Sequence, residues 1–317
     1  MTPPSLPRRA RSETDADVAS GSTLPPGPQR VHGGAPAEAG IRLQAPPERP
    51  DVTRDRTTGR THVTAHAAEP GDRWIRRFHP RPDCRLRLVC LPHAGGSASY
   101  FHAMSRLMPP GAELLAVQYP GRQDRRAEEP IDVVQDLADA VYAALLPFTD
   151  RPVALFGHSM GSLVAYELAR RLEADAGTVP AVLAVSGRRA PTVTQSEDVH
   201  KRDDDGIVAE LLALDGTQAQ VLADPDLRSL VLPAVRADYR AAETYRHRPG
   251  HQLRCPVLAL TGDRDPKAAP EEVAQWREMT SGPFGLRVYP GGHFYLADHQ
   301  ERVVADLTGP LLARPPA

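Results

Sequence analysis

Ser159 lies between two glycines in the segment FGHSMG, residues 156–161. A G-x-S-x-G segment can place a serine on a strained turn from a strand to a helix, because small flanking residues allow backbone and helix to approach closely. The apolar run PVALFG before the serine is typical of a buried strand, and the segment after it has apolar residues at helical spacing. This context favours a nucleophilic serine with an exposed hydroxyl. Taken alone, the pentapeptide also fits a serine in an ordinary turn.

An aspartate and a histidine much later in the chain could complete an acid–base system with Ser159. In an α/β-hydrolase the nucleophile, the acid and the histidine follow one another in that order, with the last two placed after later strands. Asp265 follows one predicted strand, and His293 follows the next. His293 would take the serine proton, and Asp265 would fix the tautomer of the imidazole. Asp263 is the alternative acid. We prefer Asp265 because its position after the strand leaves room to turn into the site.

The loop LPHAGGSAS, residues 91–99, could supply one donor to an oxyanion hole. Two backbone N–H groups are needed to stabilise a tetrahedral intermediate, and glycines let a loop bend its amides inward. We predict the N–H groups of Ala94 and of Met160, the residue after the nucleophile. A plain glycine turn before a helix is the alternative for this loop. His93 could line the pocket, whereas His158 should point away from the serine hydroxyl.

Predicted strands and helices alternate from Trp74 onward, which indicates βαβ units and a mostly parallel sheet covered by helices. The expected strands are 86–91, 113–119, 153–157, 181–187, 256–262 and 286–291. The expected helices are 98–108, 131–147, 159–173, 269–280 and 297–313. The long interval between the fourth and fifth strands shows no convincing strand and predicts several short helices. Such an insertion at the end of a sheet is typical of a helical lid, here about residues 192–248.

The first 72 residues differ in composition from the rest of the chain. They are rich in Pro, Arg, Thr, Ala and Gly and follow neither the strand nor the helix period. This predicts a disordered extension before a domain spanning residues 73–317. The arginines near Met1 are not followed by an apolar segment, so we do not expect a secretion signal.

Charge and cysteine usage exclude several classes of partner. The net charge of −2 and the pI of about 6.6 give no basic field for nucleic acid. No stretch approaches the roughly 18 apolar residues of a membrane span. Cys84, Cys90 and Cys255 lack C-x-x-C spacing, and the first two lie on one face of an alternating strand, which predicts packed, reduced thiols in a cytoplasmic protein. We expect no metal or organic cofactor, because the triad supplies its own acid–base chemistry.

Seven motifs, in the same order, resemble the type II thioesterases, the stand-alone α/β-hydrolases that accompany modular polyketide synthases and nonribosomal peptide synthetases. They run from about Trp74 to near the C-terminus: LPHAGGSASYF, VQYPGRQDR, FGHSMGSLVAYELARRL, SGRRAP, RADYRAAETY, LTGDRDPKA and YPGGHFYL. The resemblance implies an editing enzyme of antibiotic biosynthesis that hydrolyses acyl thioesters from the phosphopantetheine arm of acyl or peptidyl carrier protein domains. It also implies Ser159 as nucleophile, Asp265 as acid and His293 as base.

The first 72 residues depart from this family pattern, which normally begins near the segment WIRRF, residues 74–78. Either they form a genuine extension, or translation starts at a non-methionine codon at about residues 52–72.

The residues alone predict only acyl transfer to water, because the same triad would also serve an oxygen ester or an amide. A carboxylesterase acting on small-molecule oxygen esters is therefore one alternative, and a non-catalytic scaffold that binds carrier proteins is another. Carrier domains are typically acidic, so arginines near the pocket mouth are candidates for docking them. The candidates are Arg122, Arg125, Arg188 and Arg189, although for most of them we favour ordinary ion pairs at the end of the sheet.

Overall fold

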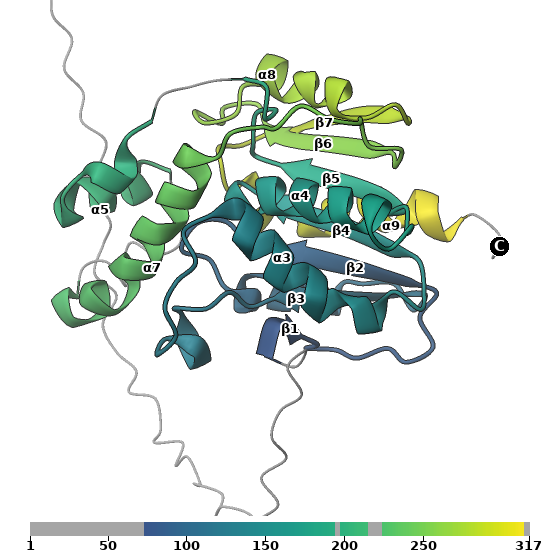
Figure 1. Ribbon diagram of the computed structural model, residues 1–317, viewed down its shortest axis with the longest axis horizontal. Helices are drawn as coiled ribbons and strands as arrows, with labels where there is room; N and C mark the ends of the chain where they lie inside the picture. The colour runs from purple at the N-terminus through teal and green to yellow at the C-terminus, as the bar shows by residue number, and fades with distance from the viewer. Residues whose placement is uncertain (1–72, 194–196, 215–223, 314–317) are drawn as a thin grey trace, which may run out of the picture. The chain divides into compact units, whose positions relative to one another are not determined.

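Residues 73–193, 197–214 and 224–313 are described in the computed structural model of the chain (Figure 1). The predicted extension over residues 1–72 lies outside the described residues. Residues 194–196 and 215–223 of the predicted lid lie outside them as well.

Seven strands form one sheet in the order β1-β3-β2-β4-β5-β6-β7. All neighbouring strands pair in parallel except β1, which is antiparallel to β3. The strands are β1 (Ile75–Arg76), β2 (Leu86–Leu91), β3 (Ala112–Val117), β4 (Val153–His158), β5 (Val182–Ser186), β6 (Val257–Gly262) and β7 (Phe284–Tyr289). The predicted mostly parallel sheet is confirmed. The short β1 was not predicted, because two residues carry no readable period.

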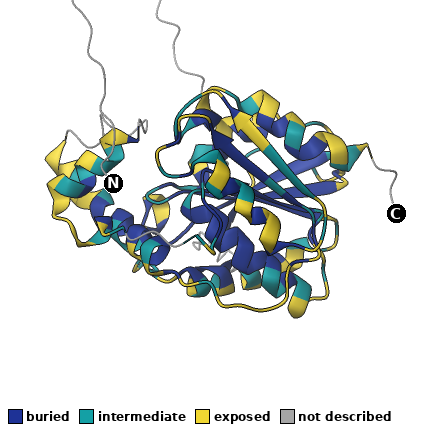
Figure 2. Ribbon diagram, turned by 90° about the horizontal axis from the view of Figure 1, so that it is seen from above, coloured by how far each residue is buried: buried dark blue, intermediate teal, exposed yellow. Residues whose placement is uncertain are grey.

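Helices cover both faces of the sheet, which is why its central strands β4 and β5 are largely apolar on both faces rather than alternating. In β2, Val89 and Leu91 pack in one buried cluster with helices α3 and α4, while Leu88 and Cys90 pack in a second cluster with α2 and α9. Figure 2 shows the buried strands between helices whose outer faces are exposed. The helices outside the insertion are α2 (His102–Arg106), α3 (Val134–Leu145), α4 (Met160–Ala174), α8 (Pro270–Ala274) and α9 (Gln300–Leu312).

Two predicted helices are each divided into an α-helical and a 3-10 segment. The predicted helix 98–108 consists of a 3-10 turn, Ala98–Phe101, followed by α2. The predicted helix 269–280 consists of α8 followed by a 3-10 segment, Gln275–Met279.

The insertion between β5 and β6 is helical in its described part. It contains a 3-10 turn (Val199–Lys201), α5 (Asp204–Ala213) and α7 (Pro225–Thr244), and α5 and α7 lie beyond the carboxyl ends of the strands (Figure 1). Both helices begin after an aspartate whose side chain accepts hydrogen bonds from first-turn amides, as N-caps do. A small apolar cluster that includes Ile207 and Val235 packs α5 against α7. The predicted helical character is therefore present, while the function of a lid stays a prediction.

The three cysteines are buried free thiols, as the sequence predicts. Burial raises the pKa of the Cys90 thiol well above its usual value and that of Cys255 to about 12. Among the described helices, none is both long and apolar enough to span a bilayer.

Candidate active site

Ser159 occupies the turn between the last residue of β4 and the first residue of α4, with φ of 53° and ψ of −117°. This backbone conformation is strained for a residue that is not glycine and requires support from its surroundings. The flanking glycines provide room: a Cβ on Gly161 would lie 2.1 Å from the Leu91 carbonyl oxygen, and one on Gly157 would lie 2.2 Å from the Gly161 oxygen. The Ser159 amide donates to the Ser186 carbonyl at 2.8 Å. The turn thus has the strained strand-to-helix conformation that the sequence predicts.

His293 and Asp265 form a buried pair. The His293 Nδ1 atom lies 3.0 Å from each carboxylate oxygen of Asp265, where an Nδ1–H group can donate. The two residues are only 3% and 7% exposed. The Lys267 amide donates to Asp265 Oδ1 at 2.8 Å and so orients the carboxylate. The alternative acid, Asp263, has a 51% exposed side chain and accepts a hydrogen bond from the Gly291 amide instead.

The close approach of the loops after β6 and β7 brings this pair together. Gly262 is level with Tyr289 in the parallel register, and the Arg264 amide donates to the Gly291 carbonyl at 2.9 Å. A Cβ on Gly262 would lie 2.4 Å from the carbonyl oxygens of Gly291 and Gly292. A larger residue at this position would therefore push the two loops apart.

One pocket contains four of the five predicted site residues. Ser159, His293, Ala94 and Met160 line it, while Asp265 contacts His293 without lining the pocket. Met160 begins α4, where the first-turn amides have no partner within the helix and the helix dipole favours negative charge. The remaining lining residues are His93, Tyr100, Gly187, Arg188, Arg189, Glu197, Leu211, Leu214, Tyr239, Ala242, Glu243, Lys267 and Phe294.

Asp238, in the middle of α7, holds the loop that contains Ala94. Its fully buried carboxylate accepts hydrogen bonds from the Gly95 amide at 2.7 Å and from two guanidinium nitrogens of Arg122 at 2.6 and 2.9 Å. Arg122 also donates to the Gly96 carbonyl at 3.1 Å. Because the Gly95 amide is occupied, it is not a donor for an oxyanion.

The two histidines near the serine have the orientations that the sequence predicts. His158 is fully buried, does not line the pocket, and has its Nδ1 3.0 Å from the Ser186 hydroxyl oxygen. His93 lines the pocket, and burial, reinforced by the neighbouring His293 and Arg122, lowers its pKa to about 3. His93 is therefore neutral at pH 7.

Three of the four arginines considered for docking are buried in ion pairs. Arg122 pairs with Asp238, and Arg125 pairs with Glu128 at 2.6 Å. Arg189 pairs with Glu197 at 3.2 Å. Their guanidinium groups are 5–6% exposed, which agrees with the ion-pair interpretation favoured from the sequence for most of these arginines. The fourth, Arg188, lines the pocket.

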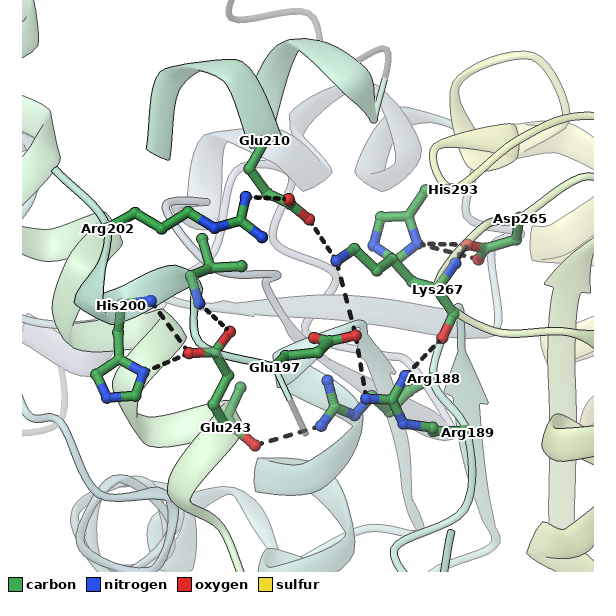
Figure 3. Close-up of polar contacts among 12 residues, drawn as sticks. Arg188, Arg189, Glu197, His200, Arg202, Glu210, Glu243, Asp265, Lys267 and His293 are labelled. Atoms are coloured by element: carbon green, nitrogen blue, oxygen red, sulfur yellow. Dashed lines mark hydrogen bonds and ion pairs between the residues drawn. The ribbon is translucent and has the colours of Figure 1, made fainter. Parts of the chain in front are cut away.

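Sequence reasoning did not identify Asp238 or Lys267 as residues that position the site. The signal for Asp238 was present, since it falls three residues after Val235 and four before Ala242, on the apolar stripe of its helix. Lys267 lies two residues after Asp265, and its ammonium contacts Glu210 of α5 and, at 3.6 Å, Glu197 (Figure 3). Both glutamates belong to the insertion, and the sequence around Lys267 does not predict where the insertion lies relative to it.

Comparison with known proteins gives consistent matches. Residues 86–309 match the model of the thioesterase domain. The thioesterase PikA5 of Streptomyces venezuelae is 55% identical over 240 residues, which cover 75% of this chain and 85% of that protein. A probable cadicidin biosynthesis thioesterase of Streptomyces griseus is 46% identical over 274 residues, covering 86% of this chain and 76% of that protein.

A solved structure matches the fold as well. The type II thioesterase BorB from the borrelidin biosynthetic cluster superposes with a TM-score of 0.71 at 49% identity, over 75% of this chain and 97% of that one. The shared sheet and flanking helices confirm the predicted α/β-hydrolase class.

Proposed function

This chain belongs to the thioesterase family, and from that premise we propose that it hydrolyses acyl thioesters held on the phosphopantetheine arm of carrier proteins. The pathway would be polyketide or nonribosomal peptide biosynthesis, where the enzyme clears stalled acyl chains. The relatives support this substrate class, since BorB is a type II thioesterase of a biosynthetic cluster. A cytoplasmic location follows from this proposal, because carrier domains work inside the cell.

The observation that carries the chemistry is the strained Ser159 in the same pocket as His293, whose Nδ1 faces the Asp265 carboxylate. With Nδ1 committed to Asp265, the Nε2 atom of His293 is the one left for the serine proton. Ser159 Oγ attacks the thioester carbonyl and passes its proton to His293. The imidazolium then protonates the departing pantetheine sulfur, leaving an acyl-serine.

Water completes the cycle by the same route in reverse. His293 takes a proton from water, the hydroxide attacks the acyl-serine, and the imidazolium returns a proton to Ser159 Oγ as the free acid leaves. In both halves the tetrahedral oxyanion would accept hydrogen bonds from the amides of Ala94 and Met160. Each such donor contributes about 3 kcal/mol to the stabilisation of the transition state.

The role of the carrier protein is tested by comparing two substrates that carry the same acyl group, one on free pantetheine and one on a carrier protein. Propionyl-pantetheine and the same propionyl arm attached to a carrier protein present an identical thioester to Ser159. We expect a kcat/KM at least about tenfold higher for the carrier-bound substrate, since only it adds protein contacts. Equal values would show that the enzyme recognises the thioester and not the carrier.

A further inference from the structure

Arg188 is a cation in the active-site pocket that forms no ion pair with a carboxylate among the described residues. It follows the turn at Gly187 after β5 and lines the pocket together with Ser159. His158, the residue before Ser159, is level with Ser186 in the parallel register. Arg188 follows Ser186 by two residues, so it lies just after the end of β5, next to the turn that contains Ser159. Its backbone carbonyl accepts a hydrogen bond from Trp276 Nε1 at 2.8 Å, which fixes the main chain.

The Arg188 guanidinium is largely uncommitted. Its Nη2 donates to the Ala242 carbonyl at 3.3 Å, while its buried Nε has no hydrogen-bond partner among the residues that the structure describes. Burial, with the nearby Arg189, lowers its pKa to about 10, so it stays charged at pH 7. Arg188 is partly buried, and Glu197 and Glu243 stabilise its charge only at longer range, without forming an ion pair with it among the described residues. A partly desolvated cation that is not held in an ion pair is a candidate for contact with a ligand.

The other charged groups around the pocket are already paired (Figure 3). Arg189 contacts Glu197, and Lys267 contacts Glu197 and Glu210. Glu243 accepts from the amides of Val199 and His200 and from the His200 ring, so its oxygens are in use. Arg188 is therefore the lining cation, among the described residues, whose donors remain available to a substrate.

We propose that Arg188 is a specificity-determining residue that binds a carbonyl or hydroxyl oxygen on the acyl chain, beyond the thioester group itself. The proposal rests on the thioesterase function proposed above. A guanidinium presents several N–H donors in one plane and accepts no hydrogen bonds. It can therefore bind an acyl chain that carries an oxygen acceptor, but gains no hydrogen bond from a saturated chain. The enzyme should then favour partly oxidised acyl chains over plain alkanoyl chains of equal length.

The test compares 3-oxobutanoyl-pantetheine with butanoyl-pantetheine, which differ by the ketone alone. For Arg188→Met we expect kcat/KM for the 3-oxo substrate to fall about 10-fold to 100-fold, the range for a hydrogen bond to a charged group. The value for butanoyl-pantetheine should change less than about threefold. Arg188→Lys should recover part of the loss, and Arg246→Met, at an exposed arginine outside this pocket, should leave the ratio unchanged.

An equal fall for both substrates, or no fall for either, would overturn the proposal. Arg188→Gln replaces the methionine variant if the latter fails to fold by circular dichroism. A second experiment measures binding without turnover. Calorimetry compares Ser159→Ala with the double variant Ser159→Ala/Arg188→Met, using the amide analogues of both substrates as ligands. Loss of the preference for the 3-oxo analogue supports the role of Arg188, and an unchanged preference refutes it. If the wild type hydrolyses neither thioester, the proposed function fails separately from this result.

Discussion

Asp238 of α7 accepts a hydrogen bond from the Gly95 amide at 2.7 Å, so a residue of the insertion holds the loop that contains Ala94. The same carboxylate is bound by Arg122, which also contacts the Gly96 carbonyl. The geometry of the proposed oxyanion hole therefore depends on a helix far away in the sequence.

Replacing Asp238 by Asn should lower both stability and turnover. The change leaves the buried Arg122 without its counter-charge, which costs about 3–5 kcal/mol of unfolding free energy, and frees the loop beside Ala94. We expect kcat to fall by about 10² as one donor is misplaced. Denaturant unfolding and steady-state kinetics measure the two effects. Asp204→Asn, which removes a largely exposed ion pair with Arg236, is the matched control and should alter neither appreciably.

Ser159→Gly should make the protein more stable while abolishing its activity. The positive φ of Ser159 is strained for a side chain but not for glycine, so the substitution should raise the unfolding free energy by about 1 kcal/mol. Urea unfolding checks this value. Ser162→Gly, three residues into the adjoining helix, should instead destabilise the protein. A loss of stability in Ser159→Gly would contradict the assignment of strain to this turn.

Variants of Asp265 and Asp263 distinguish the catalytic acid from a neighbouring aspartate with a structural role. Asp265→Asn should reduce kcat by about 10⁴, because the amide cannot hold His293 in the same tautomer. Asp263→Asn should reduce kcat less than about tenfold, since within the described part of the chain the Asp263 carboxylate makes polar contacts with the Gly291 amide and with its neighbour Arg264, and not with His293. Kinetics of both variants on one thioester give the comparison. The opposite ranking would assign the catalytic acid to Asp263.

His93 should make folding stability depend on pH. Its folded pKa of about 3 lies below the ordinary value of 6.5, so the unfolded chain binds a proton that the folded protein excludes. The contribution is complete above pH 6.5 and is lost as the pH falls toward 3, with a slope of up to about 1.4 kcal/mol per pH unit. In His93→Phe, the unfolding free energy should fall less steeply between pH 6.5 and 4. Identical slopes in variant and wild type would show that His93 is protonated in the folded protein.

The sequence predicts the elements and the chemistry of this site better than the contacts that support it. Ser159 and its glycines form one contiguous motif, and Asp265 and His293 each follow a strand that its apolar run identifies. Asp238 reaches Gly95 across 143 positions, and no local pattern predicts a pairing at that separation. For the same reason the sequence predicts an ion pair for Arg122 but not its partner, Asp238 of α7.

The central claim is that Ser159 hydrolyses acyl thioesters presented by carrier proteins. It is tested most directly by measuring acyl release from a propionyl carrier protein and from the matched oxygen ester, with the wild type and Ser159→Ala. We predict faster release of the thioester by the wild type and a fall in turnover of about 10⁶ in the variant. Faster hydrolysis of the oxygen ester would indicate a carboxylesterase, and no reaction with either substrate would indicate a non-catalytic scaffold. Undiminished release by Ser159→Ala would contradict the assignment of the nucleophile.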